Sequence, residues 1–248
     1  MKIAVVGATG QIGAYTVTAL EAAGHAVVPI SRSNGIDVYS GVGLADALSG
    51  VDAVVDASNN RSQDETEVVD FFATTSRNLL AAEHDAAVRH HVLLSVVGLD
   101  NGQRVVHYSG KREQERIVSG GSVPWTIVRA TQFYELAARV AEAAERDGVA
   151  PIAPLLVQPI APADVGAMMA EVATSDPLNA VVEVAGPQTQ DFVDMARRTL
   201  TARGRAITLT PTWRGPFNIT MAGEVLLPGP DARIAPTTFE DWLAAGGR

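Results

Sequence analysis

Three glycines near the start of the chain have a spacing that could hold a phosphate group. Gly7, Gly10 and Gly13 form a G-x-x-G-x-x-G pattern between an apolar run, residues 2–6, and an amphipathic helical segment. In such a turn, one glycine permits the sharp bend, one lets the backbone approach a pyrophosphate, and one lets the helix pack on the strand. The amides and the positive end of the helix dipole favour an anion. An ordinary glycine-rich turn is the alternative. The residues expected to bind a dinucleotide are Gly7, Thr9, Gly10, Gln11, Ile12 and Gly13.

An arginine follows the second apolar run, residues 25–30, at the place where dinucleotide-binding proteins usually carry an acid. That acid lies about 20 residues beyond the glycines and bonds the ribose 2′-hydroxyl. Here Ser31, Arg32 and Ser33 follow the run, and no acid occurs between Glu21 and Asp37. A guanidinium suits a 2′-phosphate, which a carboxylate would repel. We therefore predict that Ser31, Arg32 and Ser33 bind the 2′-phosphate of NADP(H), with a solvated surface arginine as the alternative.

Alternating strand and helix patterns must position these residues. Apolar runs at 2–6, 25–30, 51–57, 91–97 and 125–128 are separated by loops or amphipathic helical segments. This alternation is typical of βαβ units, and right-handed crossovers then give an α/β fold with a doubly wound parallel sheet of Rossmann type. Ligands of such folds bind at the carboxyl ends of the strands. Residues that end the run at 51–57 are therefore expected near the dinucleotide, namely Ala57, Ser58 and Asn59.

Three local patterns give more specific expectations. Residues 36–38 read as a very short strand, and Ser62 with Glu65 fits a capping box that opens a helix. An Ala-rich helix is expected over 133–147, and prolines follow it. We predict two parts within one compact unit: a dinucleotide-binding core over 1–135 and a smaller α/β part over 136–248 that covers the substrate.

Composition excludes several classes of protein. The chain has 248 residues, 47% of them apolar, with 19 basic and 28 acidic residues and a net charge of −9. The acidic balance argues against a nucleic-acid partner, and no run reaches the roughly 18 apolar residues of a membrane span. With no cysteine and no metal-ligand spacing among the five histidines, we predict no metal site. With no export signal, we expect a cytoplasmic monomer or homodimer that acts on a small molecule.

Several segments, spread over nearly the whole chain, resemble the atypical short-chain dehydrogenase/reductase group, specifically its NmrA-like and triphenylmethane-reductase-like members. The resemblance implies NADP(H) as the cofactor. It also implies that Asp37 and Val38 contact the adenine, with a turn-capping role for Asp37 as the alternative. The segments that carry it are Val6–Gly13, Val92–Gly98, Tyr108–Glu115, Pro124–Phe133, Ala163–Gly166, Ala185–Pro187 and Thr238–Leu243.

The same resemblance implies catalytic roles for Ser95, Tyr108 and Lys111. In the main branch of the group, the tyrosine of a Tyr-x-x-x-Lys pair passes a proton to the substrate, the lysine binds the nicotinamide ribose, and a serine orients the carbonyl. Here Tyr108 lies three residues before Lys111, and His107 occupies the usual tyrosine position. Positions three and four apart share a helix face, so Tyr108, His107 or water remain open as the proton donor. Alternatively, Tyr108 is only a packing residue, and the Ser95 hydroxyl is hydrogen-bonded to the backbone at the strand end.

Two functional hypotheses follow from this reading. The first is an NADPH-dependent oxidoreductase that transfers hydride to a small, aromatic or quinone-like acceptor, because such an acceptor tolerates the altered tyrosine spacing. The second is a non-catalytic regulator that senses NADP(H) and acts through a protein partner.

Overall fold

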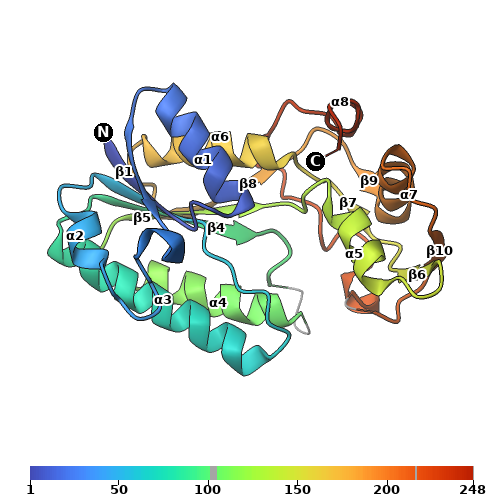
Figure 1. Ribbon diagram of the computed structural model, residues 1–248, viewed down its shortest axis with the longest axis horizontal. Coiled ribbons are helices and arrows are strands. Elements are labelled where there is room, and N and C mark those ends of the chain that lie inside the picture. Colours follow the sequence, from blue (N-terminus) through green and yellow to red (C-terminus); the bar gives the residue numbers. More distant parts are fainter. Residues whose placement is uncertain (101–104, 216, 248) are drawn as a thin grey trace. The chain divides into compact units, whose positions relative to one another are not determined.

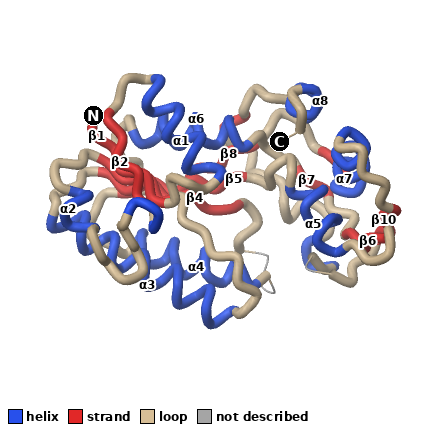
Figure 2. Tube along the Cα trace, in the orientation of Figure 1, coloured by secondary structure: helices blue, strands red, loops and turns tan. Residues whose placement is uncertain are grey.

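The largest sheet in the computed structural model, which describes residues 1–100, 105–215 and 217–247, is parallel and has seven strands (Figures 1 and 2). The strand order is β11-β8-β5-β4-β3-β1-β2, so the order reverses at β1. This is a doubly wound α/β fold, and it confirms the fold class predicted from the sequence. The strands are β1 (Lys2–Val6), β2 (Ala26–Ile30), β3 (Ala53–Asp56), β4 (His90–Val96), β5 (Trp125–Ala130), β8 (Ala180–Ala185) and β11 (Arg233–Ile234).

The register of the central strands brings their carboxyl ends together. Val6 is paired with Ile30 of β2 on one side and with Asp56 of β3 on the other. All four residues of β3 and the last four of β1 are buried. A parallel strand buried on both faces reads as a continuous apolar run, which explains why these strands were recognisable in the sequence.

Helices cover both faces of the sheet (Figure 1). On one face lie α1 (Gln11–Ala22) and α6 (Pro162–Ala173), and on the other lie α3 (Glu65–Asp85) and α4 (Val106–Ser119). The close approach of α3 and α4 requires a glycine, because a Cβ on Gly110 would overlap the side chains of Phe72 and Val68. In the part of the chain that the structure describes, no helix is both long and apolar enough to cross a membrane.

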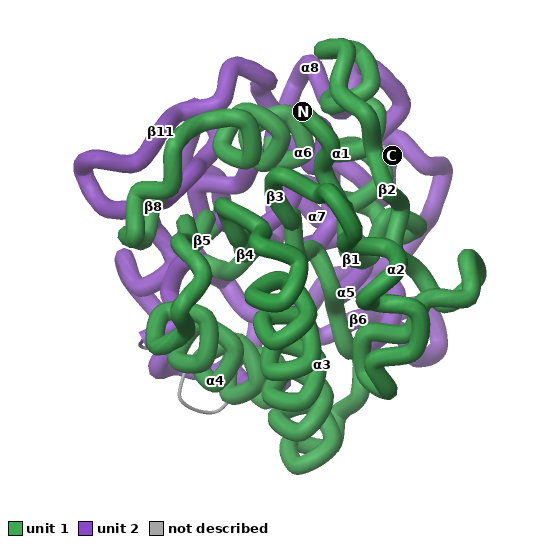
Figure 3. The backbone as a smooth tube through the Cα atoms, turned by 90° about the vertical axis from the view of Figure 1, so that its left-hand side faces the viewer, with its two compact units in different colours: residues 1–96, 106–129, 165–182 green, residues 97–105, 130–164, 183–248 purple. Residues whose placement is uncertain are grey.

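The chain divides into two compact units (Figure 3). The first comprises 1–96, 106–129 and 165–182, and it also contains the short helix α2 (Leu44–Leu48) and a 3-10 turn (Arg32–Asn34). The sequence-based division into 1–135 and 136–248 stays a prediction.

The second unit comprises 97–105, 130–164 and 183–248. Two short strand pairs lie in it, one parallel between β6 and β10 and one antiparallel between β7 and β9. Its elements besides β11 are α5 (Leu136–Ala144), β6 (Val149–Ile152), β7 (Leu156–Val157), β9 (Gln190–Asp191), α7 (Phe192–Ala202), β10 (Thr208–Pro211), a 3-10 turn (Ile219–Met221) and α8 (Phe239–Ala244).

Two local predictions about the first unit were wrong. Residues 36–38 form no strand: Asp37 makes only an isolated bridge to Val42, because glycines with positive φ on both sides turn the chain back. The predicted capping box lies two residues too early. The N-cap of α3 is Asp64, whose carboxylate accepts from the Glu67 amide, while the Ser62 hydroxyl donates to the Glu67 side chain.

The helix predicted over 133–147 is shorter at both ends. Phe133 makes a bridge to Ile160, and the amide of Tyr134 donates to the carbonyl of Ile160. A turn follows, in which the amide of Leu136 donates to the carbonyl of Phe133, so α5 begins only at Leu136. At the other end the chain turns through Asp147 and Gly148, both with positive φ, to enter β6. Tertiary pairing has overridden the helix propensity of the alanine-rich sequence here.

Candidate functional site

The glycine loop occupies the turn between β1 and α1. Gly7 has a φ of +74°, and a Cβ there would lie 2.7 Å from the carbonyl oxygen of Ala57. A Cβ on Gly13 would overlap the carbonyl oxygen of Gly7, so only glycine lets the helix start this close to the strand end. The Gly10 amide donates to the Gly7 carbonyl at 2.8 Å and closes the turn. Gly7 and Gly13 therefore have the steric roles that their spacing predicts.

The tip of this loop faces solvent with its helix amides uncapped. Gly10 is the N-cap of α1, and no side chain caps the helix there. Thr9, Gly10 and Gln11 are exposed, whereas Ile12 and Gly13 are buried and anchor the helix. Uncapped amides at the positive end of a helix dipole are a suitable site for a phosphate. Ile12 therefore serves as an anchor in this structure, while the exposed tip is where an anion can approach.

Arg32 lies beside the glycine loop because of the strand register. The amides of Gly7 and Ala8 both donate to the carbonyl of Ile30, the last residue of β2, at 3.1 and 3.4 Å. Arg32 follows two residues later in an exposed 3-10 turn, where the hydroxyls of Ser31 and Ser33 lie 2.8 Å apart. Over the residues that the structure describes, no carboxylate lies within ion-pair distance of Arg32. Its positive charge is thus available to an anion at the loop.

The loop that carries Asp37 and Val38 is hydrogen-bonded to α3. The Asp37 carboxylate accepts from the amide of Tyr39 at 3.0 Å, and the Val38 carbonyl accepts from the side-chain amide of Asn78 at 3.1 Å. The Tyr39 hydroxyl donates to Asp70 at 2.5 Å. Asp37 therefore caps a turn, which was the alternative role, and an adenine contact by Asp37 and Val38 stays a prediction.

Two buried hydroxyls at the carboxyl ends of β3 and β4 lack hydrogen-bond partners among the described residues. They are the Oγ atoms of Ser58 and Ser95, in residues that are 7% and 5% exposed. The backbone bond that was the alternative for the Ser95 hydroxyl is not observed. A buried polar atom without a partner is rare in native proteins and is often completed by a ligand. Ala57 and the exposed Asn59 flank Ser58, so the segment predicted near the dinucleotide does lie beside Gly7.

Lys111 is buried between three elements of the first unit. Its ammonium donates to the carbonyl of Leu94 at 2.9 Å and to Oε1 of Gln114 at 2.8 Å, and a longer contact of 3.5 Å leads to the carbonyl of Ser58. The ammonium also lies 4.6 Å from the centre of the Phe72 ring. Burial lowers the pKa of Lys111 to about 8, although the charges of Asp56 and Glu115 act in the opposite direction. The structure thus places Lys111 next to Ser58, which is necessary if the two residues bind the same cofactor.

The two candidate proton donors lie in the first turn of α4. Tyr108 is buried, at 5% exposure. The ring of His107 meets the edge of the Phe72 ring at 5.6 Å between centroids. Burial, followed by the nearby charge of Lys111, lowers the pKa of His107 to about 4. His107 is therefore neutral at pH 7 and holds no imidazolium proton to donate.

Sequence analysis missed two residues that hold Lys111. The side-chain amide of Gln114 donates to Oδ2 of Asp56 at 2.8 Å while its oxygen accepts from Lys111. Asp56 is 1% exposed, and its other oxygen accepts from the amide of Ser58 at 2.9 Å. Two signals were present: an acid at the end of an apolar strand, and a glutamine three residues after the lysine, on the same helix face.

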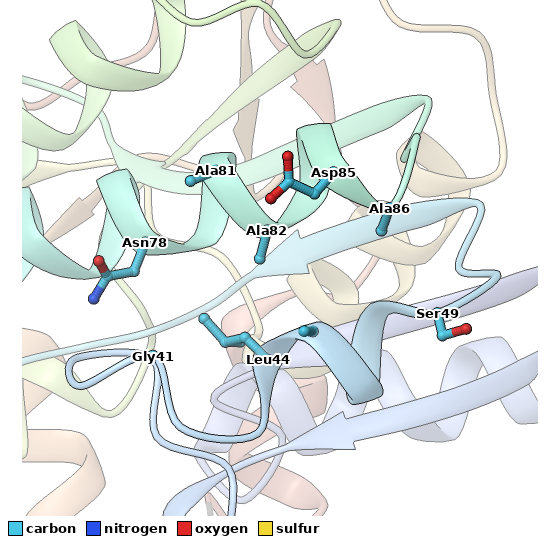
Figure 4. Close-up of a pocket in the computed structure, with 9 residues that line it drawn as sticks. Gly41, Leu44, Ser49, Asn78, Ala81, Ala82, Asp85 and Ala86 are labelled. Atoms are coloured by element: carbon cyan, nitrogen blue, oxygen red, sulfur yellow. The ribbon is translucent and has the colours of Figure 1, made fainter.

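A groove elsewhere in the first unit contains none of the predicted site residues (Figure 4). It has a volume of about 460 Å³ and lies between α2 and α3. Leu44, Asn78, Ala82 and Asp85 are among the side chains that line it. Its walls offer no cation for a phosphate, so the groove is separate from the candidate cofactor site.

A family model described as NAD(P)H-binding matches residues 7–176, more than half of the chain. The chain belongs to the NAD(P)H-binding family. The match begins at the first glycine of the loop and includes Arg32, Ser95 and Lys111. The cofactor class predicted from the sequence is thereby confirmed as NAD(P)H.

Curated relatives match only part of the chain. A (4-alkanoyl-5-oxo-2,5-dihydrofuran-3-yl)methyl phosphate reductase of Streptomyces griseus is 31% identical over 144 residues, which are 53% of this chain and 48% of the relative. A photosystem II assembly factor of Synechocystis is 26% identical over 149 residues, which are 54% of this chain and 46% of the relative. The chain spans about half the length of the curated relatives it matches.

Solved structures of NADPH-binding reductases have a similar fold. An NADPH-dependent quinone oxidoreductase of Escherichia coli, solved with NADPH, superposes with a TM-score of 0.66 at 23% identity, covering 85% of this chain and 78% of that chain. A triphenylmethane reductase of Citrobacter, solved with NADP(H), gives 0.64 at 18% identity, covering 86% and 79%. At these identities the likeness establishes the fold, and it agrees with the resemblance seen in the sequence.

Proposed function

We propose that the protein is an NADPH-dependent reductase that transfers hydride to a small, aromatic or quinone-like acceptor. The observation that carries the proposal is the arrangement at the ends of β1 and β2. The helix amides at the end of β1 have no side-chain cap, and β1 is paired with β2, after which Arg32 follows. Arg32 has no ion-pair partner among the described residues, and no acid that could repel a 2′-phosphate lies between the end of β2 and Asp37. When bound, NADPH would supply the hydride.

Lys111, Ser58 and Ser95 would bind the part of the cofactor that reacts. Two of the three ammonium protons of Lys111 are engaged in short hydrogen bonds, and the third has only the long contact to Ser58. That proton can donate to a ribose hydroxyl, and the unpartnered hydroxyls of Ser58 and Ser95 can complete their hydrogen bonding with the cofactor or substrate. These roles for Lys111, Ser58 and Ser95 are part of the proposal.

Neither candidate proton donor is well suited to protonate the substrate, which favours a hydride acceptor that needs no proton from the protein. His107 is neutral at pH 7, and Tyr108 has the wrong spacing to Lys111 for the usual pair. A quinone that gains a hydride becomes a hydroquinone anion, which takes its proton from water, and a cationic dye is neutralised by the hydride itself. The names of the structural neighbours, a quinone oxidoreductase and a triphenylmethane reductase, support this class of acceptor.

The test is a screen of NADPH oxidation with purified protein against quinones, cationic dyes and aldehydes. The expected result is turnover with quinones or dyes and none with aldehydes, which need a proton at the carbonyl oxygen. The Gly10→Val variant serves as the control for contaminating reductases, because it should show no turnover. Saturable NADPH binding with no turnover across the whole set would contradict the enzymatic proposal.

That last outcome would favour a second candidate function, a non-catalytic NADP(H) sensor that acts on a protein partner. One observation supports it: a curated relative is named as an assembly factor and not as an enzyme. The sensor would retain the cofactor affinity and lack turnover. A partner would then be sought by comparing the proteins captured with and without NADPH.

A further inference from the structure

A chain of two hydrogen bonds connects the buried ammonium of Lys111 to a buried carboxylate. The oxygen of the Gln114 side chain accepts from Lys111 at 2.8 Å, and its nitrogen donates to Asp56 at 2.8 Å. Gln114 is fully buried, Asp56 is 1% exposed and Lys111 is 5% exposed. An amide can serve both partners at once only in this orientation, because Lys111 has no acceptor and a carboxylate has no donor.

This chain of bonds determines which proton of Lys111 remains available. The short bonds to Leu94 and Gln114 fix two of the three N–H directions. The third points toward the carbonyl of Ser58 at 3.5 Å, which is beyond the usual range of an N–H···O bond. Without Gln114 the ammonium would have one short bond only, and the flexible lysine stem would let it turn away from the strand ends.

Asp56 supplies the negative charge that a buried ammonium needs. An isolated charge in the interior is costly, and it is retained only when it is paired or well hydrogen-bonded. Five other groups face Lys111: Glu115 and His107 from its own helix, the Phe72 ring from α3, a backbone carbonyl from β4, and the carbonyl of Ser58 after β3. Of these only Glu115 is anionic, and it is engaged by Arg129 at 2.7 Å.

We propose that Gln114 and Asp56 are positioning residues for Lys111, Gln114 by directing the ammonium and Asp56 by keeping it protonated, so that one N–H is presented to the cofactor. This inference rests on the proposed function in one respect, that Lys111 contacts bound NADPH. Neither residue touches the cofactor in this scheme, so both act through Lys111.

The scheme has a definite dependence on pH. Burial holds the pKa of Lys111 at about 8, so its charge is lost as the pH rises through that value. The NADPH dissociation constant of the wild type should therefore rise above about pH 8. Removing the charge of Asp56 lowers the pKa of Lys111, and the rise should then begin about one pH unit lower.

The experiment measures NADPH binding by calorimetry from pH 6 to pH 10 for the wild type, Asp56→Asn and Gln114→Leu. Asp56→Asn should shift the midpoint down by about one unit, and Gln114→Leu should weaken binding roughly tenfold at pH 7 through loss of a charge-assisted contact. The Lys111→Met variant should bind NADPH more weakly than the wild type, and its dissociation constant should show no pH-dependent transition between pH 6 and pH 10. The matched control is Glu113→Gln, which removes a carboxylate from the same helix where it pairs with Arg116, and its curve should coincide with that of the wild type.

A second measurement without cofactor separates this inference from the proposed function. Between about pH 8 and pH 10 the unfolded chain keeps the Lys111 proton while the folded chain has lost it, so the free energy of unfolding rises with pH. In Asp56→Asn the rise in the free energy of unfolding should start about one pH unit lower, and in Lys111→Met this contribution should be absent.

If Asp56→Asn is merely less stable and its binding and unfolding curves keep the wild-type midpoint, the positioning role is overturned. If NADPH does not bind at all but the unfolding curves shift as stated, the proposed function fails and the interaction of Asp56 with Lys111 stands.

Discussion

The two ends of the candidate site are built in opposite ways. At the glycine loop, residues 9–11 are exposed and the groups available to a phosphate are backbone amides, with the Arg32 side chain in solvent beside them. At the other end the groups are side chains, and those of Asp56, Lys111 and Gln114 are almost completely buried. Solvent screens charges at the first end, while burial shifts pKa values at the second. Binding should therefore depend on salt through the glycine loop and on pH through Lys111.

The largest expected effect is at the glycine loop. Gly10→Val should abolish measurable NADPH binding, a loss of at least about a hundredfold, because a branched side chain would occupy the space of the phosphate at the helix N-terminus. The fold should persist, since a Cβ on Gly10 meets only the Gly7 carbonyl, at 3.1 Å. Circular dichroism checks the fold and calorimetry the binding. Near-normal affinity in this variant would show that the loop does not hold the cofactor.

The next effect is at the buried end. Lys111→Met removes one charge-assisted hydrogen bond to the cofactor, so the NADPH dissociation constant should rise about tenfold and turnover should fall. The loss should be the same at low and high salt, in contrast to losses at the exposed end. Steady-state kinetics at two salt concentrations provide the check. If the loss caused by Lys111→Met disappears in high salt, Lys111 interacts with the cofactor as a solvent-screened group, and the contrast between the buried and the exposed end is wrong.

The smallest effect is expected at Tyr108. If the acceptor takes its proton from water, Tyr108→Phe should leave the turnover number within about threefold of the wild type, because general acid catalysis by a side chain contributes a hundredfold or more. The measurement is kcat with a quinone and with a cationic dye. A hundredfold loss with the quinone alone would identify Tyr108 as the proton donor.

The contrast between the two ends also explains what could be predicted from the sequence. The glycine loop depends on three residues within one turn, and the steric needs of Gly7 and Gly13 are local, so their spacing was sufficient. The alternation of apolar runs and helices likewise determined the doubly wound sheet. Arg32 could be placed because strand pairing brings the end of β2 to the loop in any fold of this class.

The buried end required information that a single sequence does not contain. Asp56 and Gln114 are 58 residues apart in the chain, and no local pattern shows that they meet. Short strand pairs such as β6 with β10 have too few residues to show a period. The helix expected over 133–147 is shortened by the pairing of Phe133 with Ile160 and by the turn at Asp147 and Gly148, which no local pattern shows. The buried pair of His91 with Glu83, at 2.8 Å, likewise depends on how α3 packs on the sheet.

Arg32 provides the most direct test, by calorimetric titration of NADPH and NADH into the wild type and Arg32→Ala. The guanidinium should contribute one or two charge-assisted hydrogen bonds to the 2′-phosphate, so the substitution should weaken NADPH binding by roughly ten- to a hundredfold and leave NADH nearly unchanged. Raising the salt concentration should bring the wild type toward the variant, because an exposed ion pair is screened. Equal losses for the two cofactors, or wild-type protein that binds both equally well, would contradict the claim that this site selects NADPH through Arg32.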